Sequence, residues 1–228
     1  MFTETAEFYD LAYSWKDYAA EVARLRDLIG REGGTLLDVA CGTGAHLELL
    51  APHYRAEGVD LDPGMVELTR SRGLTAAQAD LATLDLGGRR FDVVTCLFSS
   101  IGYVPDMAGA VARLAAHVAP AGVLVVEPWL SPDQIGAPRI SLHTGESEST
   151  TLARMGRLHV DGRRCAIEFQ YLVGRAGVIE HFDERHHTWL WTVDEYAAAF
   201  AAAGLEATYD ERGLMGRGLW LATRPAAA

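Results

Sequence analysis

A short segment of small residues follows one apolar run in this chain of 228 residues. The run "TLL" leads into "DVACGTG", which places two glycines around a threonine shortly after an aspartate. Glycine adopts positive φ angles at little cost and lets a ligand approach the backbone with no Cβ in the way. We therefore interpret Asp38, Ala40, Gly42 and Gly44 as a ligand-binding turn, although packing alone accounts for the glycines of many strand-to-helix turns.

Two aspartates at the ends of the next predicted strands indicate which ligand this turn could hold. Asp60, followed by Leu61, lies in "GVDLD" and can accept hydrogen bonds from both hydroxyls of a ribose. Asp80 ends "QAD" and can accept from an adenine amine, with the backbone N–H of Leu81 beside it. Leu47 stands where the dinucleotide fingerprint needs its third glycine, which disfavours a diphosphate here. The set predicts S-adenosylmethionine rather than NAD.

Several segments resemble known motifs, in order and at the usual spacing. "LLDVACGTG", "GVDLD", "QADL" and "FDVVTCLFSSIGYV" are similar to the successive motifs of class I methyltransferases. A closer resemblance, to the deoxyaminosugar N-methyltransferases, is carried by "EFYDLAY", "KDYAAE", "LVVEPW", "HHTWLWTVDEYAAAFAAAGL" and "GRGLW". That group acts on nucleotide-linked 3-amino sugars in macrolide and related antibiotic pathways. The chain departs from the group's pattern after Trp129, where "LSPDQIGAP" replaces a more aromatic, acidic loop.

The resemblance implies an N-methyltransferase that uses S-adenosylmethionine and acts on a dTDP-linked deoxyaminosugar, and it implies a homodimer. Methyl transfer from a sulfonium to an amine is an in-line displacement, so holding the reacting atoms in place supplies most of the catalysis. The amine must also be neutral when it attacks. We expect Tyr9 to cover the donor and Leu97 to line its site.

Three residues are candidates for contact with the reacting amine. Tyr103 follows the fourth predicted strand and could contact the amine or form an aromatic wall. Glu127 ends the fifth strand and could pair with the ammonium or anchor a loop. His181 could act as a base. We expect the substrate to be bound by a larger set, namely Tyr18, Ser99, Ser100, Tyr103, Trp129, His186 and Arg217.

The candidates differ in how strongly their chemistry supports a role. Arg217 is flanked by glycines, and its guanidinium suits phosphate oxygens, although a surface arginine in a turn is the alternative. His186 and His187 alternate faces on a predicted strand, so we expect no metal site. Cys41, Cys96 and Cys165 follow no metal-binding or disulfide pattern, and we expect them to be buried thiols.

The predicted elements alternate between strand and helix through the first half of the chain, which favours an α/β fold with a doubly wound, mostly parallel sheet. We expect residues 1–130 to form the donor-binding core with an N-terminal lid helix, 131–192 an antiparallel extension on the substrate and dimer side, and 193–228 a helix and strand that complete the core sheet. Helices are predicted over 17–30, 45–54, 63–73, 107–122 and 193–207, and strands over 34–40, 56–62, 74–81, 89–100, 123–129 and 216–224. Alternation over 151–192 predicts antiparallel strands.

Composition limits the partners. The formal charge of −11 disfavours nucleic acid and anionic membranes. The first ten residues show no signal segment and no apolar run is long enough to span a bilayer, so we expect a cytoplasmic protein with a small-molecule substrate. Alternatives are a methyltransferase for another natural-product acceptor and a non-catalytic protein that binds S-adenosylmethionine. A nicotinamide-dependent sugar oxidoreductase is disfavoured because Leu47 replaces the third glycine and no Tyr-x-x-x-Lys pair is present.

Overall fold

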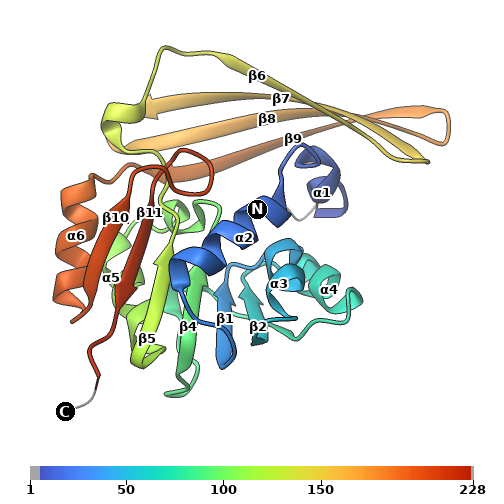
Figure 1. Ribbon diagram of the computed structural model, residues 1–228. Helices are drawn as coiled ribbons and strands as arrows, with labels where there is room; N and C mark the ends of the chain where they lie inside the picture. The colour runs from blue at the N-terminus through green and yellow to red at the C-terminus, as the bar shows by residue number, and fades with distance from the viewer. Residues whose placement is uncertain (1–5, 227–228) are drawn as a thin grey trace.

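The structure is a computed structural model that describes residues 6–226. Two sheets organise these residues: a seven-stranded sheet in the order β10-β11-β5-β4-β1-β2-β3, and a four-stranded sheet in the order β6-β7-β8-β9. In Figure 1 the four-stranded sheet lies across one end of the seven-stranded core. The core strands are β1 Thr35–Val39, β2 Arg55–Asp60, β3 Ala76–Gln78, β4 Phe91–Cys96, β5 Val118–Val126, β10 Glu206–Asp210 and β11 Leu219–Thr223.

The core is a parallel sheet with an antiparallel edge. Strands β1 to β5 pair in parallel, β11 runs antiparallel to β5, and β10 runs antiparallel to β11. Parallel sheets have both faces covered, and this requirement accounts for the nearly continuous apolar strands. The α-helices are α1 Tyr9–Ala12, α2 Tyr18–Ile29, α3 Ala45–Leu50, α4 Pro63–Ser71, α5 Met107–Ala116 and α6 Val193–Ala202.

Successive strand residues pack against different helices because side chains alternate across a sheet. Leu36 and Val93 pack in one cluster with α2 and α3, whereas Leu37 and Val94 pack in another with α5 and α6. The predicted α/β fold with a doubly wound, mostly parallel sheet is therefore confirmed.

Several predicted helices extend beyond the helices of the structure, as the one predicted over 45–54 does, which ends at Leu50. The helix predicted over 107–122 ends at Ala116, and β5 begins at Val118. Pro120 explains the difference, because proline lacks the N–H that a helix interior needs and disfavours helical backbone before it. The helix predicted over 193–207, with Gly204 closing it, ends at Ala202, and Gly204 lies just beyond it in the left-handed region at φ +72°. The following residues form β10, an edge strand that the sequence pattern did not indicate.

The four-stranded sheet is antiparallel throughout, and it comprises β6 Ile140–Glu146, β7 Thr150–Asp161, β8 Arg164–Arg175 and β9 Val178–Trp189. The segment predicted to form antiparallel strands, 151–192, therefore omits β6, which precedes it in the chain. We call the face that carries Arg154, Phe169, Tyr171, Glu184 and His186 the inner face. These residues alternate with exposed ones such as Met155, Gln170 and Leu172 on the outer face. Helix α1 packs against β6 and β7.

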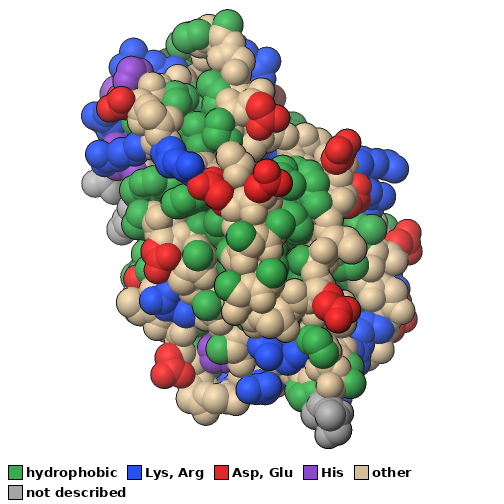
Figure 2. Space-filling model, turned by 90° about the vertical axis from the view of Figure 1, so that its left-hand side faces the viewer, with side chains coloured by type: hydrophobic (Ala, Val, Ile, Leu, Met, Phe, Trp, Pro, Cys, Tyr) green, Lys and Arg blue, Asp and Glu red, His purple; other side chains and the backbone are tan. Residues whose placement is uncertain are grey.

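The space-filling view in Figure 2 shows the side on which α6 lies. Hydrophobic side chains gather in the middle of this side, where the upper lobe joins the core, with acidic side chains among them. Within residues 6–226, no helix is long and apolar enough to cross a membrane. The prediction that the chain carries no signal segment rests partly on residues 1–5, which lie outside the described residues.

Candidate functional site

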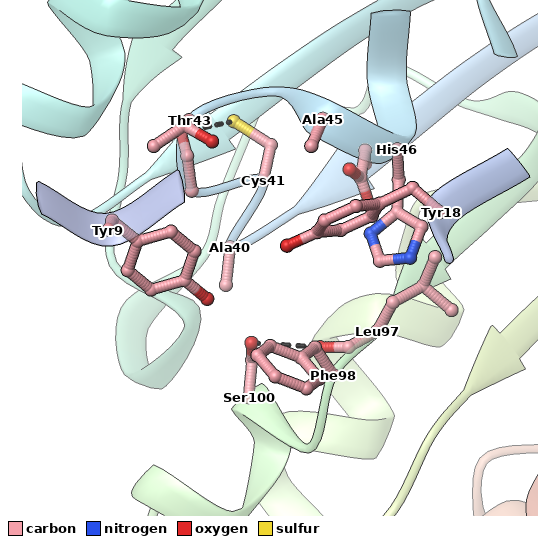
Figure 3. Close-up of a pocket in the computed structure, with 12 residues that line it drawn as sticks. Tyr9, Tyr18, Ala40, Cys41, Thr43, Ala45, His46, Leu97, Phe98 and Ser100 are labelled. Atoms are coloured by element: carbon pink, nitrogen blue, oxygen red, sulfur yellow. Dashed lines mark hydrogen bonds between the residues drawn. The ribbon is translucent and has the colours of Figure 1, made fainter. Parts of the chain in front are cut away.

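The glycine turn leaves the carboxyl end of β1 and lines a cavity. The backbone is left-handed at Ala40, Gly42 and Gly44, with φ angles of +59°, +57° and +83°. A Cβ on Gly42 would meet no atom within 4 Å, so its glycine is required by the backbone angle and leaves open space beside the chain. The lining residues surround this space in Figure 3; they are Tyr9, Tyr18, Asp38, Ala40, Cys41, Gly42, Thr43, Ala45, His46, Leu97, Phe98 and Ser100.

Two carboxylates lie beside the turn, and one of them, Asp60, bonds its backbone. Asp60 Oδ2 accepts a hydrogen bond from Gly42 N at 2.8 Å, and its Oδ1 accepts from Asp62 N at 2.9 Å. Asp38 is 2 % exposed, and its Oδ1 accepts from Thr95 Oγ1 at 2.7 Å. Burial raises the pKa of Asp60, and it raises the pKa of Asp38 to about 7. Both acids therefore lie in surroundings that disfavour their charged form.

The predicted donor-binding residues are spread over neighbouring strand ends. Tyr9, Asp38, Ala40, Gly42 and Leu97 line the cavity, whereas Gly44 is the residue from which α3 begins. The others lie at the exits of β2 and β3 and outside the cavity lining, namely Asp60, Leu61, Asp80 and Leu81. Because β1, β2 and β3 are adjacent and parallel, all these positions share one edge of the sheet, where ligands of such sheets bind.

Behind the cavity lies a buried charged cluster that sequence reasoning missed. Lys16 and Glu21 form an ion pair, and His46 Nε2 lies 2.9 Å from Glu21 Oε2. The Lys16 ammonium also lies 4.5 Å from the centroid of the Tyr18 ring and 4.6 Å from that of Phe98. Burial alone would raise the pKa of Glu21, but the hydrogen bonds from His46 and Lys16 bring it below its usual value. The only signal for this cluster in the sequence was the segment "KDYAAE", which contains Lys16 and Glu21 and resembles a motif of the deoxyaminosugar N-methyltransferases.

A strained turn after β4 forms the opposite wall. Phe98 and Ser99 are left-handed, with φ angles of +52° and +64°. Glu127 Oε2 accepts from Phe98 N at 2.7 Å, and Ser99 Oγ donates to Pro128 O at 2.8 Å. Glu127 is fully buried, and its Oε1 has no hydrogen-bond partner among residues 6–226. Glu127 thus anchors the turn with one oxygen and keeps the other available.

Burial and charge act in opposite directions on Glu127. Burial raises its pKa, while the nearby charges of Arg217 and Lys16 oppose the rise. Arg217 Nη1 lies 3.0 Å from Ser99 Oγ, and its guanidinium lies 5.1 Å from the ring centroid of Trp129. The structure therefore brings Ser99, Glu127, Trp129 and Arg217 together beside the Phe98 turn.

The remaining predicted residues lie in three different places. Tyr103 and His186 meet under the inner face, with ring centroids 5.8 Å apart, and burial raises the pKa of the Tyr103 hydroxyl. Tyr18 and Ser100 line the donor cavity instead. His181 lies on the outer face, where its Nε2 is 2.7 Å from Gln170 Oε1. The structure does not bring His181 to the cavity or to Tyr103.

The inner face also holds polar residues that sequence reasoning did not select. Tyr171 donates to Glu184 Oε2 at 2.9 Å, and His186 Nε2 lies 3.3 Å from the same oxygen. Arg154 is 2 % exposed beside them, 4.3 Å from the ring centroid of Tyr13. The available signal for these residues was the alternation of side chains along the strands "TLARM" and "HFDERHH". Alternation alone does not show which of the two sets faces inward.

The described part of the chain contains no group of three His, Cys, Asp or Glu side chains that could hold a metal ion, and its cysteines are free and buried. An open parallel sheet with an antiparallel edge, a left-handed glycine turn after β1 and acids at the next strand ends define a class of protein that binds a nucleoside-containing ligand above the sheet. The antiparallel sheet presents a polar inner face that includes Arg154, Glu184 and His186.

Comparison with known proteins assigns the family. Residues 9–209 match the family described as a methyltransferase domain, and the chain belongs to that family. It is 41 % identical to a dTDP-3-amino-3,6-dideoxy-α-D-glucopyranose N,N-dimethyltransferase of Streptomyces fradiae, over 95 % of this chain and 89 % of that protein. It is 38 % identical to a dTDP-3-amino-3,4,6-trideoxy-α-D-glucopyranose N,N-dimethyltransferase of Streptomyces venezuelae, over 95 % of this chain and 96 % of that protein.

Solved structures agree. SAM-bound CalS10, an amino pentose methyltransferase from Micromonospora echinaspora, is 41 % identical with a TM-score of 0.84, over 95 % of this chain and 96 % of that chain. Streptomyces venezuelae DesVI is 37 % identical with a TM-score of 0.90, over 98 % of this chain and 99 % of that chain. The predicted resemblance to aminosugar N-methyltransferases is confirmed.

Proposed function

We propose that this protein transfers a methyl group from S-adenosylmethionine to the amino group of a dTDP-linked deoxyaminosugar, and that it does so twice at one nitrogen. The observation that carries the proposal is similarity along almost the whole chain to enzymes named for that reaction, including the segment that forms the antiparallel sheet. Similarity confined to the core would support only the donor.

The donor's place follows from the turn. The bare backbone at Gly42 admits the methionine part of the donor, and Asp60 at the end of β2 accepts from the ribose hydroxyls, as acids there do in related sheets. Asp80 at the end of β3 is assigned to the adenine side. Tyr9 and Tyr18, which line the cavity, then cover the donor.

The acceptor lies between the Phe98 turn and the inner face of the antiparallel sheet. Arg217 is assigned to the diphosphate, because a guanidinium matches phosphate oxygens with paired donors. The unpartnered Oε1 of Glu127 and the buried Tyr103 hydroxyl are assigned to the amine. The amine's lone pair attacks the methyl carbon, the carbon–sulfur bond breaks, and adenosylhomocysteine leaves as a neutral thioether. The surplus proton on nitrogen passes to Glu127 or to water.

Positioning carries most of the rate. Placing reacting atoms about 3–3.5 Å apart and in line can supply roughly 7–11 kcal/mol, whereas a general base typically supplies about 10²–10⁴-fold. Loss of any one proton acceptor therefore slows the enzyme without stopping it.

The test is a product assay. The protein is incubated with S-adenosylmethionine and dTDP-3-amino-3,6-dideoxyglucose, and the products are weighed by mass spectrometry. We expect mono- and then dimethylated sugar nucleotide, and no methylation of dTDP-6-deoxyglucose, the matched control that lacks the amine. Donor binding without methylation of any nucleotide-linked aminosugar would contradict the proposal and favour a different acceptor or a non-catalytic protein.

We also propose that two copies associate through the outer face of the antiparallel sheet. Leu142, Met155 and Leu172 are 61 %, 51 % and 52 % exposed there. Large apolar side chains gathered on one face are typical of an interaction surface. Light scattering is expected to give a dimer for the wild type and for Ala202→Glu, which adds the same charge at an exposed position of α6 in the core, and a monomer for Met155→Glu. A monomeric wild type contradicts this assignment.

A further inference from the structure

Arg154, in the middle of β7, is the most buried arginine whose surroundings the function assigned above leaves unexplained. Its side chain is 2 % exposed. The guanidinium carbon lies 4.3 Å from the ring centroid of Tyr13 and 4.5 Å from that of Phe169. Its Nε and Nη1 have no hydrogen-bond partner anywhere in the described chain.

Such an arrangement is costly without a ligand. Removing a charged group from water carries a large penalty unless hydrogen bonds replace those that water made. Aromatic faces attract the cation but accept no conventional hydrogen bond from its N–H groups. The nearby Tyr13 and Tyr171 side chains hold the pKa of Arg154 above its usual value against the effect of burial. Two donors on the fork still require oxygen acceptors.

The position of Arg154 connects these donors to the reaction. The Tyr13 ring that covers Arg154 also lies 5.0 Å from Phe98 and 4.7 Å from Tyr9, measured between ring centroids. Phe98 and Tyr9 both line the donor cavity. Arg154 is therefore separated from the donor cavity by a single aromatic side chain.

The neighbours of Arg154 indicate which oxygen atoms it meets. Tyr171, whose ring centroid lies 5.9 Å from the guanidinium carbon of Arg154, donates to the buried carboxylate of Glu184, and His186 lies beside that carboxylate. A carboxylate this close disfavours a diphosphate by repulsion between like charges. A planar cation and a planar carboxylate beside the rings of Tyr13 and Phe169 suit a ring that bears hydroxyls, which can accept from the first and donate to the second.

We propose that Nε and Nη1 of Arg154 donate hydrogen bonds to ring hydroxyl oxygens of the acceptor sugar, and so set the sugar's orientation under the inner face. This inference rests on the proposed function. Arg154 then acts on the sugar, while Arg217, on the other side of the Tyr13–Phe98 pair, acts on the diphosphate. Neither role transfers a proton.

Binding measurements on three ligands separate the roles. Calorimetry gives the dissociation constants of dTDP-3-amino-3,6-dideoxyglucose, of thymidine diphosphate and of adenosylhomocysteine for the wild type, Arg154→Met and Arg154→Lys. Because hydrogen bonds to charged groups are strong, Arg154→Met is expected to weaken binding of the aminosugar nucleotide about 10- to 100-fold. Thymidine diphosphate and adenosylhomocysteine should bind within about 2-fold of the wild type. The control is Arg157→Met on the same strand, where Arg157 pairs with Glu168 in solvent.

Each outcome decides something. Arg154→Lys keeps the charge but loses the fork, so it should also weaken the aminosugar nucleotide selectively, and it serves if the methionine variant does not fold. If Arg154→Met weakens binding of thymidine diphosphate as much as binding of the aminosugar nucleotide, the proposal is overturned in favour of a phosphate site. Unchanged aminosugar binding in a folded variant overturns it in favour of a purely structural arginine. A wild type that binds the donor but no aminosugar nucleotide sinks the proposed function itself, which is a different result.

Discussion

In the proposed site, the donor turn and the inner face of the antiparallel sheet differ in how the chain would contact its ligand. The donor turn has small side chains or none. Ala40, Gly42 and Gly44 have left-handed backbone, and Asp60 stabilises the bend by accepting a hydrogen bond from Gly42 N. At the inner face the chain supplies side chains instead, with Arg154 and Glu184 buried among aromatic rings. The first arrangement suits one constant ligand, whereas the second allows the acceptor to change through side-chain replacement on a fixed sheet.

The largest expected effect breaks the donor half alone. Asp60→Ala removes the carboxylate that accepts from Gly42 N and, in our account, from the ribose. Because charge-assisted hydrogen bonds are strong and the turn loses its brace, adenosylmethionine should bind about 100-fold more weakly by calorimetry. Thymidine diphosphate binding should change by less than about 3-fold.

The control for that variant is Asp106→Ala, which removes an aspartate that caps α5 by accepting from Gly109 N. It should lower the free energy of unfolding by roughly 0.5–2 kcal/mol and leave donor binding intact. If both variants lose the donor equally, the effect of Asp60 is global instability, and the donor half of the comparison fails.

Asp38 gives a pH dependence to the donor half. Burial raises its pKa to about 7 in the folded protein, so the folded state binds a proton that the unfolded state releases near pH 4. Stability contributed by this group is therefore present at low pH and is lost as pH rises from about 4 to about 7, on the order of a few kcal/mol. Denaturant titrations of the wild type and Asp38→Asn should show a steeper decline for the wild type across that window. Parallel pH profiles would contradict the assignment.

Arg217 sharpens the acceptor half. Arg217→Lys keeps a charge but loses the paired donors that match phosphate, so thymidine diphosphate should bind about 10-fold more weakly. Its effect on adenosylhomocysteine should be small. Arg212→Lys, in the same connection between β10 and β11 but exposed, is the matched control. Loss of donor affinity alone in Arg217→Lys would move this arginine to the other half of the site.

The smallest expected effect concerns the link between the two halves. Asp10, in α1, accepts from Thr43 Oγ1 at 2.6 Å and pairs with Arg72. Exposed pairs contribute little, so Asp10→Asn should change stability by less than about 1 kcal/mol. Because Thr43 belongs to the donor turn and α1 packs against the antiparallel sheet, the variant should raise the KM for both substrates about 2- to 5-fold. An effect on only one substrate would show that α1 serves that half alone.

The two halves also differ in how far the sequence predicts them. The donor turn is predictable because glycines at a strand exit indicate left-handed backbone, and an aspartate just before a helix indicates an N-cap. Asp62, for example, lies just before Pro63 and caps α4 by accepting from Gly64 N. The set of side chains that faces inward on the antiparallel sheet cannot be predicted in the same way, because both faces of that sheet carry polar residues. A one-residue change of register exchanges the faces, and only the folded chain decides that Arg154 points inward and His181 outward.

A crystal structure with adenosylhomocysteine and dTDP-3-amino-3,6-dideoxyglucose bound together tests the central claim most directly. The account predicts the thioether above the Gly42 turn, the ribose on Asp60, and the sugar under the inner face with its nitrogen directed in line at the sulfur. It further predicts the diphosphate on Arg217 and a ring hydroxyl on Arg154. A donor bound away from the β1 exit, or a sugar that lies outside the space between the Phe98 turn and the antiparallel sheet, would contradict it.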